Sequence, residues 1–207
     1  MVYSIFQGDD TVIKKLSDIL LKYLIKSDVI ESNKESIDYY RYGLEITISS
    51  TLNIILILLV GIISHNFTES IAFLICFVPL RQYTGGYHAN SYLKCNITFV
   101  SLYILLLFIY HLTSAKIDFY IELLSVLFSN IIFLTECPFE HKNKPLSDNQ
   151  KHKHKILAVT LGLLYGAVGV VLKVFAYNIG VIFLYTLVLI SLLVIVATLQ
   201  KIREGEE

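Results

Sequence analysis

The sequence is poor in charged residues. Asp, Glu, Lys and Arg make up 16% of its 207 residues, whereas hydrophobic residues make up 55% and the mean hydropathy is +0.65. Average soluble domains contain about 25% charged residues. The composition therefore argues against a water-soluble globule and predicts a single membrane-embedded domain over residues 1–207.

The chain also lacks an excess of charge of either sign, because 17 basic residues balance 17 acidic ones. Nothing in this balance points to a nucleic-acid partner or to an acidic ligand. The charged first thirty residues contain no uninterrupted apolar core, which argues against a cleaved secretory signal. Insertion into the membrane is expected to depend on the later segments.

Cysteine is scarce, and its three copies, Cys76, Cys95 and Cys137, have no paired spacing. An odd number without close pairs argues against a disulfide framework and against a four-cysteine zinc site. Reduced thiols on the cytoplasmic side are the expectation. The sequence predicts no metal site and no cofactor.

What the chain has instead is a series of apolar blocks, most of them about 20 residues long, enough to cross a hydrocarbon core of about 30 Å as helix. We predict an all-α, polytopic membrane protein with about six spans, within a range of four to six. The second block is short, so we expect it to be tilted, to borrow flanking residues, or to be re-entrant. The blocks cover residues 44–64, 69–80, 96–112, 119–137, 156–176 and 179–199.

The N-terminal segment, residues 1–42, contains an amphipathic stretch, Thr11–Lys26. Apolar residues recur there every three or four positions, and lysines occupy the other face. We predict a helix that lies in the membrane interface, the alternative being a helix that covers other helices. The transmembrane region is expected over residues 43–200, followed by a tail, residues 201–207.

Lysine and arginine predict the orientation, because these residues are retained on the cytoplasmic side of short connections. An even number of spans with both termini inside places nearly all of them inside, and Lys116 outside. Lys173, near the outer end of the fifth block, is expected to reach that interface. The two polar connections, residues 81–95 and 138–155, then face the cytoplasm.

The first inner connection concentrates polar chemistry in Arg81, Gly85, Gly86, His88 and Cys95. A cysteine attacks as thiolate, and a neighbouring imidazole can accept its proton, so His88 is a candidate base for Cys95. The diglycine amides are candidate donors to an oxyanion. Arg81 is a candidate for the same role or for binding a substrate carboxylate.

Spacing alone does not establish this pair. Seven residues on a straight helix place His88 and Cys95 on one face but about 10 Å apart. The helix would have to break between Ala89 and Leu93, the side chains would have to lean together, or substrate binding would have to close the gap. The simpler alternative is an interfacial histidine and a small hydrophobic cysteine.

The second inner connection is basic. Its lysines either set topology and attract anionic lipid or recognise an acidic substrate tail. They are Lys142, Lys144, Lys151, Lys153 and Lys155. A rival pair of Cys137 and His141 is interrupted by Pro138, and the histidines here are too scattered to predict a metal site. Glu136, at the inner side, is a candidate for orienting His88.

The sequence resembles the AgrB family, the accessory gene regulator processing peptidases of Gram-positive bacteria. The resemblance covers most of the chain and includes YRYGLE, RQYTGGYHANSYLKC and PFEHKNKPLSD, at residues 40–45, 81–95 and 138–148. Its most specific part is the histidine and cysteine seven residues apart after a diglycine. It implies that His88 and Cys95 form the catalytic pair, supported by Arg81 and Gly86.

The resemblance also implies a function. Such enzymes cleave the C-terminal part of a small membrane-associated propeptide, AgrD-like in kind, and help to form a cyclic thiolactone signal for quorum sensing. A thioester acyl-enzyme is the expected intermediate. The implied partners are this propeptide and membrane lipids, and a symmetric homodimer is compatible with them. The implied location is the cell membrane, with the active site on the cytoplasmic side.

Two functions of other classes are also compatible with the sequence. Six spans with intramembrane acids would suit a peptide transporter or exporter without proteolytic activity. A purely structural membrane partner would need neither His88 nor Cys95. Replacing Cys95 separates these functions, because a peptidase then loses cleavage, whereas a transporter never cleaves its substrate.

Overall fold

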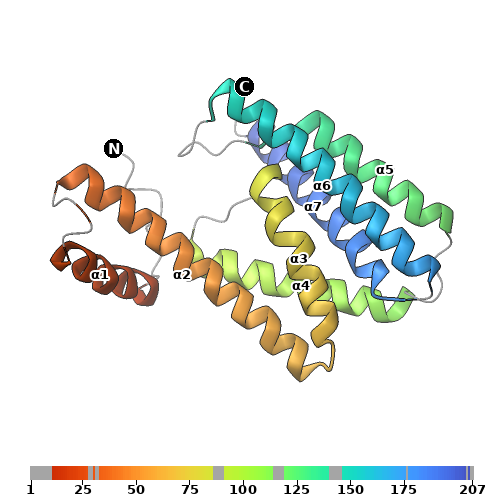
Figure 1. Cartoon of the computed structure of the whole chain (residues 1–207), viewed down its shortest axis with the longest axis horizontal. Helices are drawn as coiled ribbons and strands as arrows, with labels where there is room; N and C mark the ends of the chain where they lie inside the picture. Colours follow the sequence, from red (N-terminus) through yellow and green to blue (C-terminus); the bar gives the residue numbers. More distant parts are fainter. Residues whose placement is uncertain are drawn as a thin grey trace. The chain divides into compact units, whose positions relative to one another are not determined.

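The computed structural model describes residues 11–27, 30, 33–85, 91–113, 119–139, 146–175, 177–203 and 205. This part of the chain forms seven α-helices and no β-strand, which confirms the predicted all-α fold (Figure 1). The helices are α1 (Thr11–Lys26), α2 (Lys34–Ile63), α3 (Phe67–Thr84), α4 (Tyr92–Thr113), α5 (Phe119–Glu136), α6 (Asp148–Val174) and α7 (Gly180–Arg203).

Four helices among the described residues, α2, α4, α6 and α7, are long and apolar enough to cross a membrane. Their candidate spans contain 22 to 28 residues, and at about 1.5 Å per residue each exceeds the thickness of the hydrocarbon core. Helices α3 and α5 are shorter, with 18 residues each. The described spans therefore lie at the lower end of the predicted range of four to six.

The apolar blocks predicted where the helices are and where α5 begins, but not where α2 and α6 begin. Helix α2 begins at Lys34 instead of Leu44, and α6 begins at Asp148 instead of Ile156. A capping box starts α6, because Ser147 and Gln150 each accept a hydrogen bond from the other's backbone N–H. Hydrophobicity marks the part of a helix suited to lipid, whereas caps decide where the helix starts.

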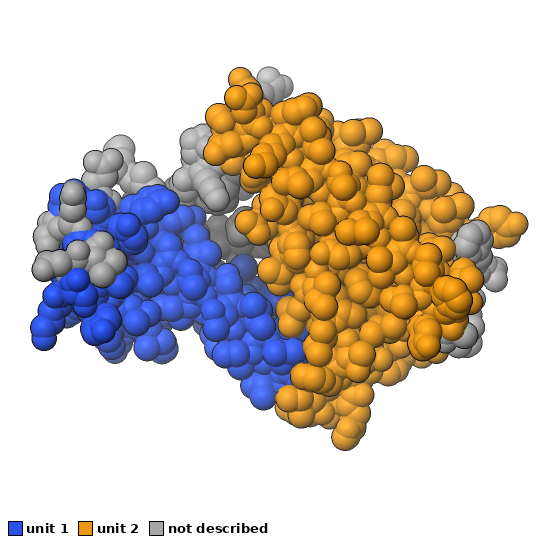
Figure 2. Space-filling view, viewed as in Figure 1, with its two compact units in different colours: residues 1–59, 89–102 blue, residues 60–88, 103–207 orange. Residues whose placement is uncertain are grey.

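The chain divides into two compact units, shown in different colours in Figure 2. One unit is residues 1–59 with 89–102, and the other is residues 60–88 with 103–207. The first holds α1, most of α2 and the beginning of α4. The second holds α3, α5, α6 and α7. The single domain expected from the sequence stays a prediction.

The core of the second unit is built around α7. Helices α5, α6 and α7 pack against one another, and α3 packs against α6 and α7 (Figure 1). Because α7 has neighbours on several sides, 61% of its most apolar window is buried, against 22% for α6. The remaining apolar surface of α6 is available to lipid.

Small residues bring α6 close to its neighbours. Gly162, Gly166 and Gly169 are buried, and a Cβ at Gly166 would lie 2.6 Å from a methyl carbon of Val126 on α5. Small residues in membrane helices allow this approach, and the helices then gain van der Waals contact. The glycines on one face of α6 therefore determine how closely its neighbours pack against it.

An ion pair joins α5 to α6. The ammonium of Lys173 lies 2.8 Å from the carboxylate of Glu122, whose side chain is only 3% exposed. A buried carboxylate needs a partner, since an unpaired buried charge is costly. Lys173, which was predicted to reach the outer interface, forms this pair with Glu122, and its position in the membrane stays a prediction.

Helix α1 has the bounds that the sequence predicts, Thr11–Lys26, and lies beside α2 in the first unit (Figure 1). Ile13, Ser17 and Leu21 are buried on one face. A second apolar face stays exposed. It consists of Val12, Leu16, Ile19, Leu20 and Tyr23. An open apolar face of this kind is what an interfacial helix requires, and the interfacial position itself stays a prediction.

Candidate functional site

The predicted site has described residues in both units. Arg81 and Gly85 belong to the second unit and Cys95 to the first. Gly86 and His88 lie outside the described residues. The pairing of His88 with Cys95 therefore stays a prediction.

The three cysteines of the chain differ in their surroundings. Cys76 and Cys137 are buried, whereas Cys95 is half-buried. Cys137 follows α5 and lies outside the four long helices; burial raises the pKa of its thiol to about 12 and outweighs the opposing effect of Arg81. A nucleophilic cysteine must be accessible as well as ionisable. Of the three cysteines, Cys95 alone is partly exposed.

Cys95 lies in the first turn of α4, which begins at Tyr92. Its N–H donates to the Ser91 carbonyl at 3.0 Å. The amino end of a helix carries partial positive charge, which favours an anion such as a thiolate. Helix α4 begins after His88 in the sequence.

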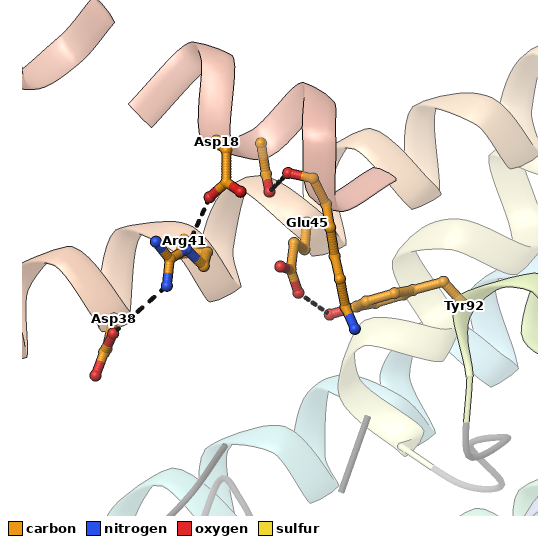
Figure 3. Close-up of polar contacts among 7 residues, drawn as sticks. Asp18, Asp38, Arg41, Glu45 and Tyr92 are labelled. Atoms are coloured by element: carbon orange, nitrogen blue, oxygen red, sulfur yellow. Dashed lines mark hydrogen bonds and ion pairs between the residues drawn. The ribbon is translucent and has the colours of Figure 1, made fainter. Parts of the chain in front are cut away.

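Two side chains on α4 close to Cys95 are bonded to α2. The Tyr92 hydroxyl donates to the Glu45 carboxylate at 3.1 Å (Figure 3). One turn further along α4, the Asn96 side-chain oxygen accepts two hydrogen bonds from α2. They come from the Ser49 hydroxyl at 2.8 Å and the Asn53 amide at 3.0 Å.

The sequence analysis missed these polar contacts. None of Glu45, Ser49 and Asn53 was predicted to belong to the site. The signal was present, because these three residues follow one another at four-residue intervals on α2 and so share one face. What the sequence could not show is that Tyr92 and Asn96 face them.

Charged residues tie α1 to the same region of α2. Arg41 lies 3.1 Å from Asp18 of α1 and 3.8 Å from Asp38 of α2 (Figure 3). Partly exposed ion pairs contribute on the order of 0–1 kcal/mol to stability. Their main effect here is on the orientation of α1, because they hold it beside the part of α2 that precedes Glu45.

In the second unit, the chain leaves α3 through a turn held by Phe139. Gly85 has φ 68° and ψ −147°, and its N–H donates to the Arg81 carbonyl at 3.1 Å. The Phe139 N–H donates to the Thr84 carbonyl at 2.9 Å, and Gly85 and Phe139 form an isolated parallel bridge. A Cβ at Gly85 would collide with the Phe139 carbonyl oxygen. The position therefore requires glycine both for its backbone angles and for space.

Arg81 supports the same turn. Its guanidinium donates to the Gly85 carbonyl, so a cation in the last turn of α3 bonds to a carbonyl just beyond the helix end. The predicted roles of Arg81 and Gly85 at an oxyanion or a substrate carboxylate stay predictions. The arrangement seen is one that fixes the direction in which the chain enters the predicted catalytic segment.

The basic second connection is described in part. Lys142, Lys144 and His141 lie outside the described residues. The remaining predicted lysines lie in the first turns of α6. They are Lys151, Lys153 and Lys155. The rings of Tyr83 on α3 and His154 on α6 are 5.4 Å apart, so this basic start of α6 lies beside the end of α3.

Glu136, the predicted orienting acid, accepts a hydrogen bond from the Thr198 hydroxyl at 3.1 Å. This bond joins α5 to α7. The orientation of His88 by Glu136 stays a prediction. Among the described residues, no group of three or more His, Cys, Asp or Glu side chains is arranged to hold a metal ion.

Comparison with known proteins connects this site to a family. The model for accessory gene regulator B matches residues 17–200. The chain is similar to putative AgrB-like protein 2 of Clostridium perfringens strain 13, with 30% identity over 62% of this chain and 64% of that protein. Protein FsrB of Enterococcus faecalis is 23% identical over 72% of this chain and 62% of that protein.

The similarity extends to staphylococci. Accessory gene regulator protein B of Staphylococcus haemolyticus is 24% identical over 60% of this chain and 65% of that protein. The matched part of this chain thus spans slightly less than two thirds of several of these relatives. No solved structure matches the chain. Because the family model covers most of its length, the chain belongs to the accessory gene regulator B family, membrane proteins that take part in quorum sensing.

Proposed function

We propose that the protein is a membrane cysteine endopeptidase, with Cys95 as nucleophile and His88 as general base and then general acid. The observation that carries the proposal is the position of Cys95. It is the half-buried cysteine of the three, and it lies in the first turn of a helix, where a thiolate is favoured. The same residue ends the motif that resembles the family's catalytic segment.

In the proposed first step, His88 accepts the proton of Cys95 and the thiolate attacks the scissile carbonyl. An oxyanion forms and is stabilised by hydrogen-bond donors, for which Arg81 and the amide of Gly86 are candidates. The C–N bond then breaks, and the proton held by His88 passes to the departing amine. The product is a thioester between Cys95 and the N-terminal part of the substrate.

The proposed substrate is a small AgrD-like propeptide that loses its C-terminal part. A cysteine within the propeptide then attacks the acyl-enzyme, so that its own S–C bond forms, the Cys95 S–C bond breaks, and a cyclic thiolactone is released. One thioester replaces another in this step. The first step converts an amide into a higher-energy thioester, so removal of the cleaved tail draws the reaction forward. Exclusion of water at the membrane edge prevents hydrolysis.

We further propose that the basic start of α6 binds an acidic tail of the propeptide. The supporting observation is that His154, which lies among these lysines on α6, has its ring 5.4 Å from that of Tyr83 on α3. The test reverses three charges together, at Lys151, Lys153 and Lys155. Cleavage should fall while membrane insertion is unchanged, and full cleavage by this variant would exclude recognition of the tail.

The main test is cleavage of a matching propeptide by purified protein in lipid nanodiscs. We expect Cys95→Ala and His88→Ala to lose cleavage, and Cys137→Ala, the matched control at a buried cysteine, to retain it. Mass spectrometry of trapped intermediate should locate the acyl group on Cys95. Cleavage by Cys95→Ala would refute the proposal, and a purely linear product from the wild type would refute the cyclisation step.

A peptide exporter without proteolysis is the second candidate function. The observation in its favour is the Glu122–Lys173 pair, because ionisable residues inside membrane proteins often mark transport paths. An exporter would move intact propeptide across a vesicle membrane and would tolerate Cys95→Ala. The same set of variants therefore separates the two functions.

A further inference from the structure

The polar contacts of the first unit form a ladder between α2 and α4 beside Cys95. We use the name polar ladder for five residues joined by three hydrogen bonds. They are Glu45, Ser49 and Asn53 on α2 with Tyr92 and Asn96 on α4. All five belong to the first unit.

The ladder is buried in helices that are otherwise suited to lipid. Glu45 is 8% exposed, Ser49 6% and Asn96 4%, and both α2 and α4 are apolar enough to span a membrane. Polar side chains in such helices are costly and rare, and they usually serve a function or hold helices together. The ladder lies at the turn of α4 that carries the proposed nucleophile, so its hydrogen bonds restrain that turn.

The two α4 members lie on either side of Cys95 in the sequence. Tyr92 and Asn96 are four residues apart and face α2 together, as successive side chains on one helix face do. Cys95 is rotated about 100° from Asn96 and about 60° from Tyr92, so it lies at the side of the face that α2 holds. Bonds on both sides of Cys95 thus fix the rotation of the first turn of α4.

The carboxylate of the ladder lies near charged residues of α1 and α2. Figure 3 shows Asp18, Arg41 and Asp38 bonded in a row, and Tyr92 bonded to Glu45. Lys14 and Arg41 attract the Glu45 carboxylate, and Asp18 repels it. The acceptor of the Tyr92 hydroxyl therefore lies among charges carried by both α1 and α2.

We propose that Tyr92 and Asn96 are positioning residues for Cys95, and that the polar ladder sets the direction in which its thiol points. This inference rests on the proposed function, since it concerns the nucleophile of that reaction. A displacement of about 1 Å in a reacting group can reduce a rate about 100-fold. The ladder therefore governs kcat more than substrate binding.

The principal variant is Asn96→Leu, which keeps a similar volume and removes the acceptor of two hydrogen bonds. We expect kcat to fall between about 10-fold and 100-fold, with KM changed less than about threefold. Asn96→Asp keeps an acceptor oxygen and should retain kcat within about threefold of the wild type. Tyr92→Phe is the second variant, for use if Asn96→Leu does not insert into the membrane. It removes a single hydroxyl and so should preserve the fold.

The matched control on the same helix is Tyr103→Phe. It removes a buried hydrogen bond of 2.5 Å to Ser70, two helical turns beyond Asn96, and should leave kcat unchanged. A second readout is the rate at which a maleimide alkylates Cys95 as pH is varied. The pH profile should change in Asn96→Leu and Tyr92→Phe and stay as in the wild type in Tyr103→Phe.

The outcomes of this experiment separate the two proposals. If Asn96→Leu and Tyr92→Phe keep the wild-type kcat and alkylation profile while Cys95→Ala is inactive, the positioning role is wrong and the peptidase proposal stands. If Cys95→Ala still cleaves the propeptide, both fail. If Asn96→Asp is as impaired as Asn96→Leu, the acceptor oxygen is not responsible for the loss of kcat. The proposal that the ladder positions Cys95 is then wrong.

Discussion

Gly85 provides a direct test of how the turn before His88 is held, and the substitution is Gly85→Ala. The methyl group is added at φ 68° and ψ −147°, a backbone region occupied almost entirely by glycine, where other residues pay about 1–3 kcal/mol. The new Cβ would lie 3.1 Å from the Phe139 carbonyl carbon and closer to its oxygen. These are backbone atoms, so they cannot rotate away as the end of a side chain would.

The magnitude follows from the two responses open to the turn. In the first, the turn keeps its shape and the backbone is strained. In the second, the turn opens and loses two hydrogen bonds, the 2.9 Å bond from Phe139 to Thr84 and the bond from Arg81 to Gly85. Neutral hydrogen bonds contribute about 1 kcal/mol net, and those to a charged group about 1.5–3 kcal/mol. Keeping the turn costs about 1–3 kcal/mol in backbone strain, besides the contact with Phe139, and opening it costs about 2.5–4 kcal/mol. The lower cost of the two decides which occurs.

The assay compares Gly85→Ala with Gly43→Ala in detergent and in nanodiscs. Gly43 is a helical glycine of α2 with nothing within 4 Å of an added Cβ, so alanine there should stabilise the protein by about 0.5–1 kcal/mol. Gly85→Ala should lower both the thermal midpoint and the cleavage rate, and Gly43→Ala should lower neither. Wild-type stability and cleavage in Gly85→Ala would show that Phe139 does not hold the turn.

Three further predictions concern burial. At pH 8 a maleimide should label Cys95 and spare Cys137, because a thiol with a pKa of about 12 is only about 0.01% ionised at that pH; peptide mass spectrometry checks this, and faster labelling of Cys137 would contradict it. Lys173→Met should lower the free energy of unfolding by about 3–5 kcal/mol, because Glu122 loses its partner at 2.8 Å, whereas replacing both with apolar residues should be nearly neutral. Gly166→Leu should separate α5 from α6 and lower the thermal midpoint, and a variant as stable as the wild type would refute close packing there.

Much of the fold follows from local patterns in the chain. The spacing of apolar residues predicted α1 with its observed bounds, and the apolar blocks located the other six helices of the described chain. Helical periodicity and the thickness of a bilayer act on each segment by itself, so a sequence shows them directly. The starts of α2 and α6 were missed because polar residues extend these helices beyond the apolar part.

The site could be predicted in its residues but not in its contacts. The motif from Arg81 to Cys95 was visible as a spacing, and the roles of Gly86 and His88 in it stay predictions. The bond between Glu45 and Tyr92 joins residues 47 positions apart, and no local pattern reveals such a partner. The same holds for Phe139 at the turn after α3.

The sequence by itself determined that this chain is helical, suited to a membrane, and a carrier of a cysteine and a histidine in a family motif. Those properties depend on composition and on spacing along the chain. Only the tertiary structure decided that Cys95 is half-buried while Cys76 and Cys137 are buried, and that Lys173 pairs with Glu122. Burial and pairing depend on contacts between segments that are distant in the chain, so they are decided only when the chain folds.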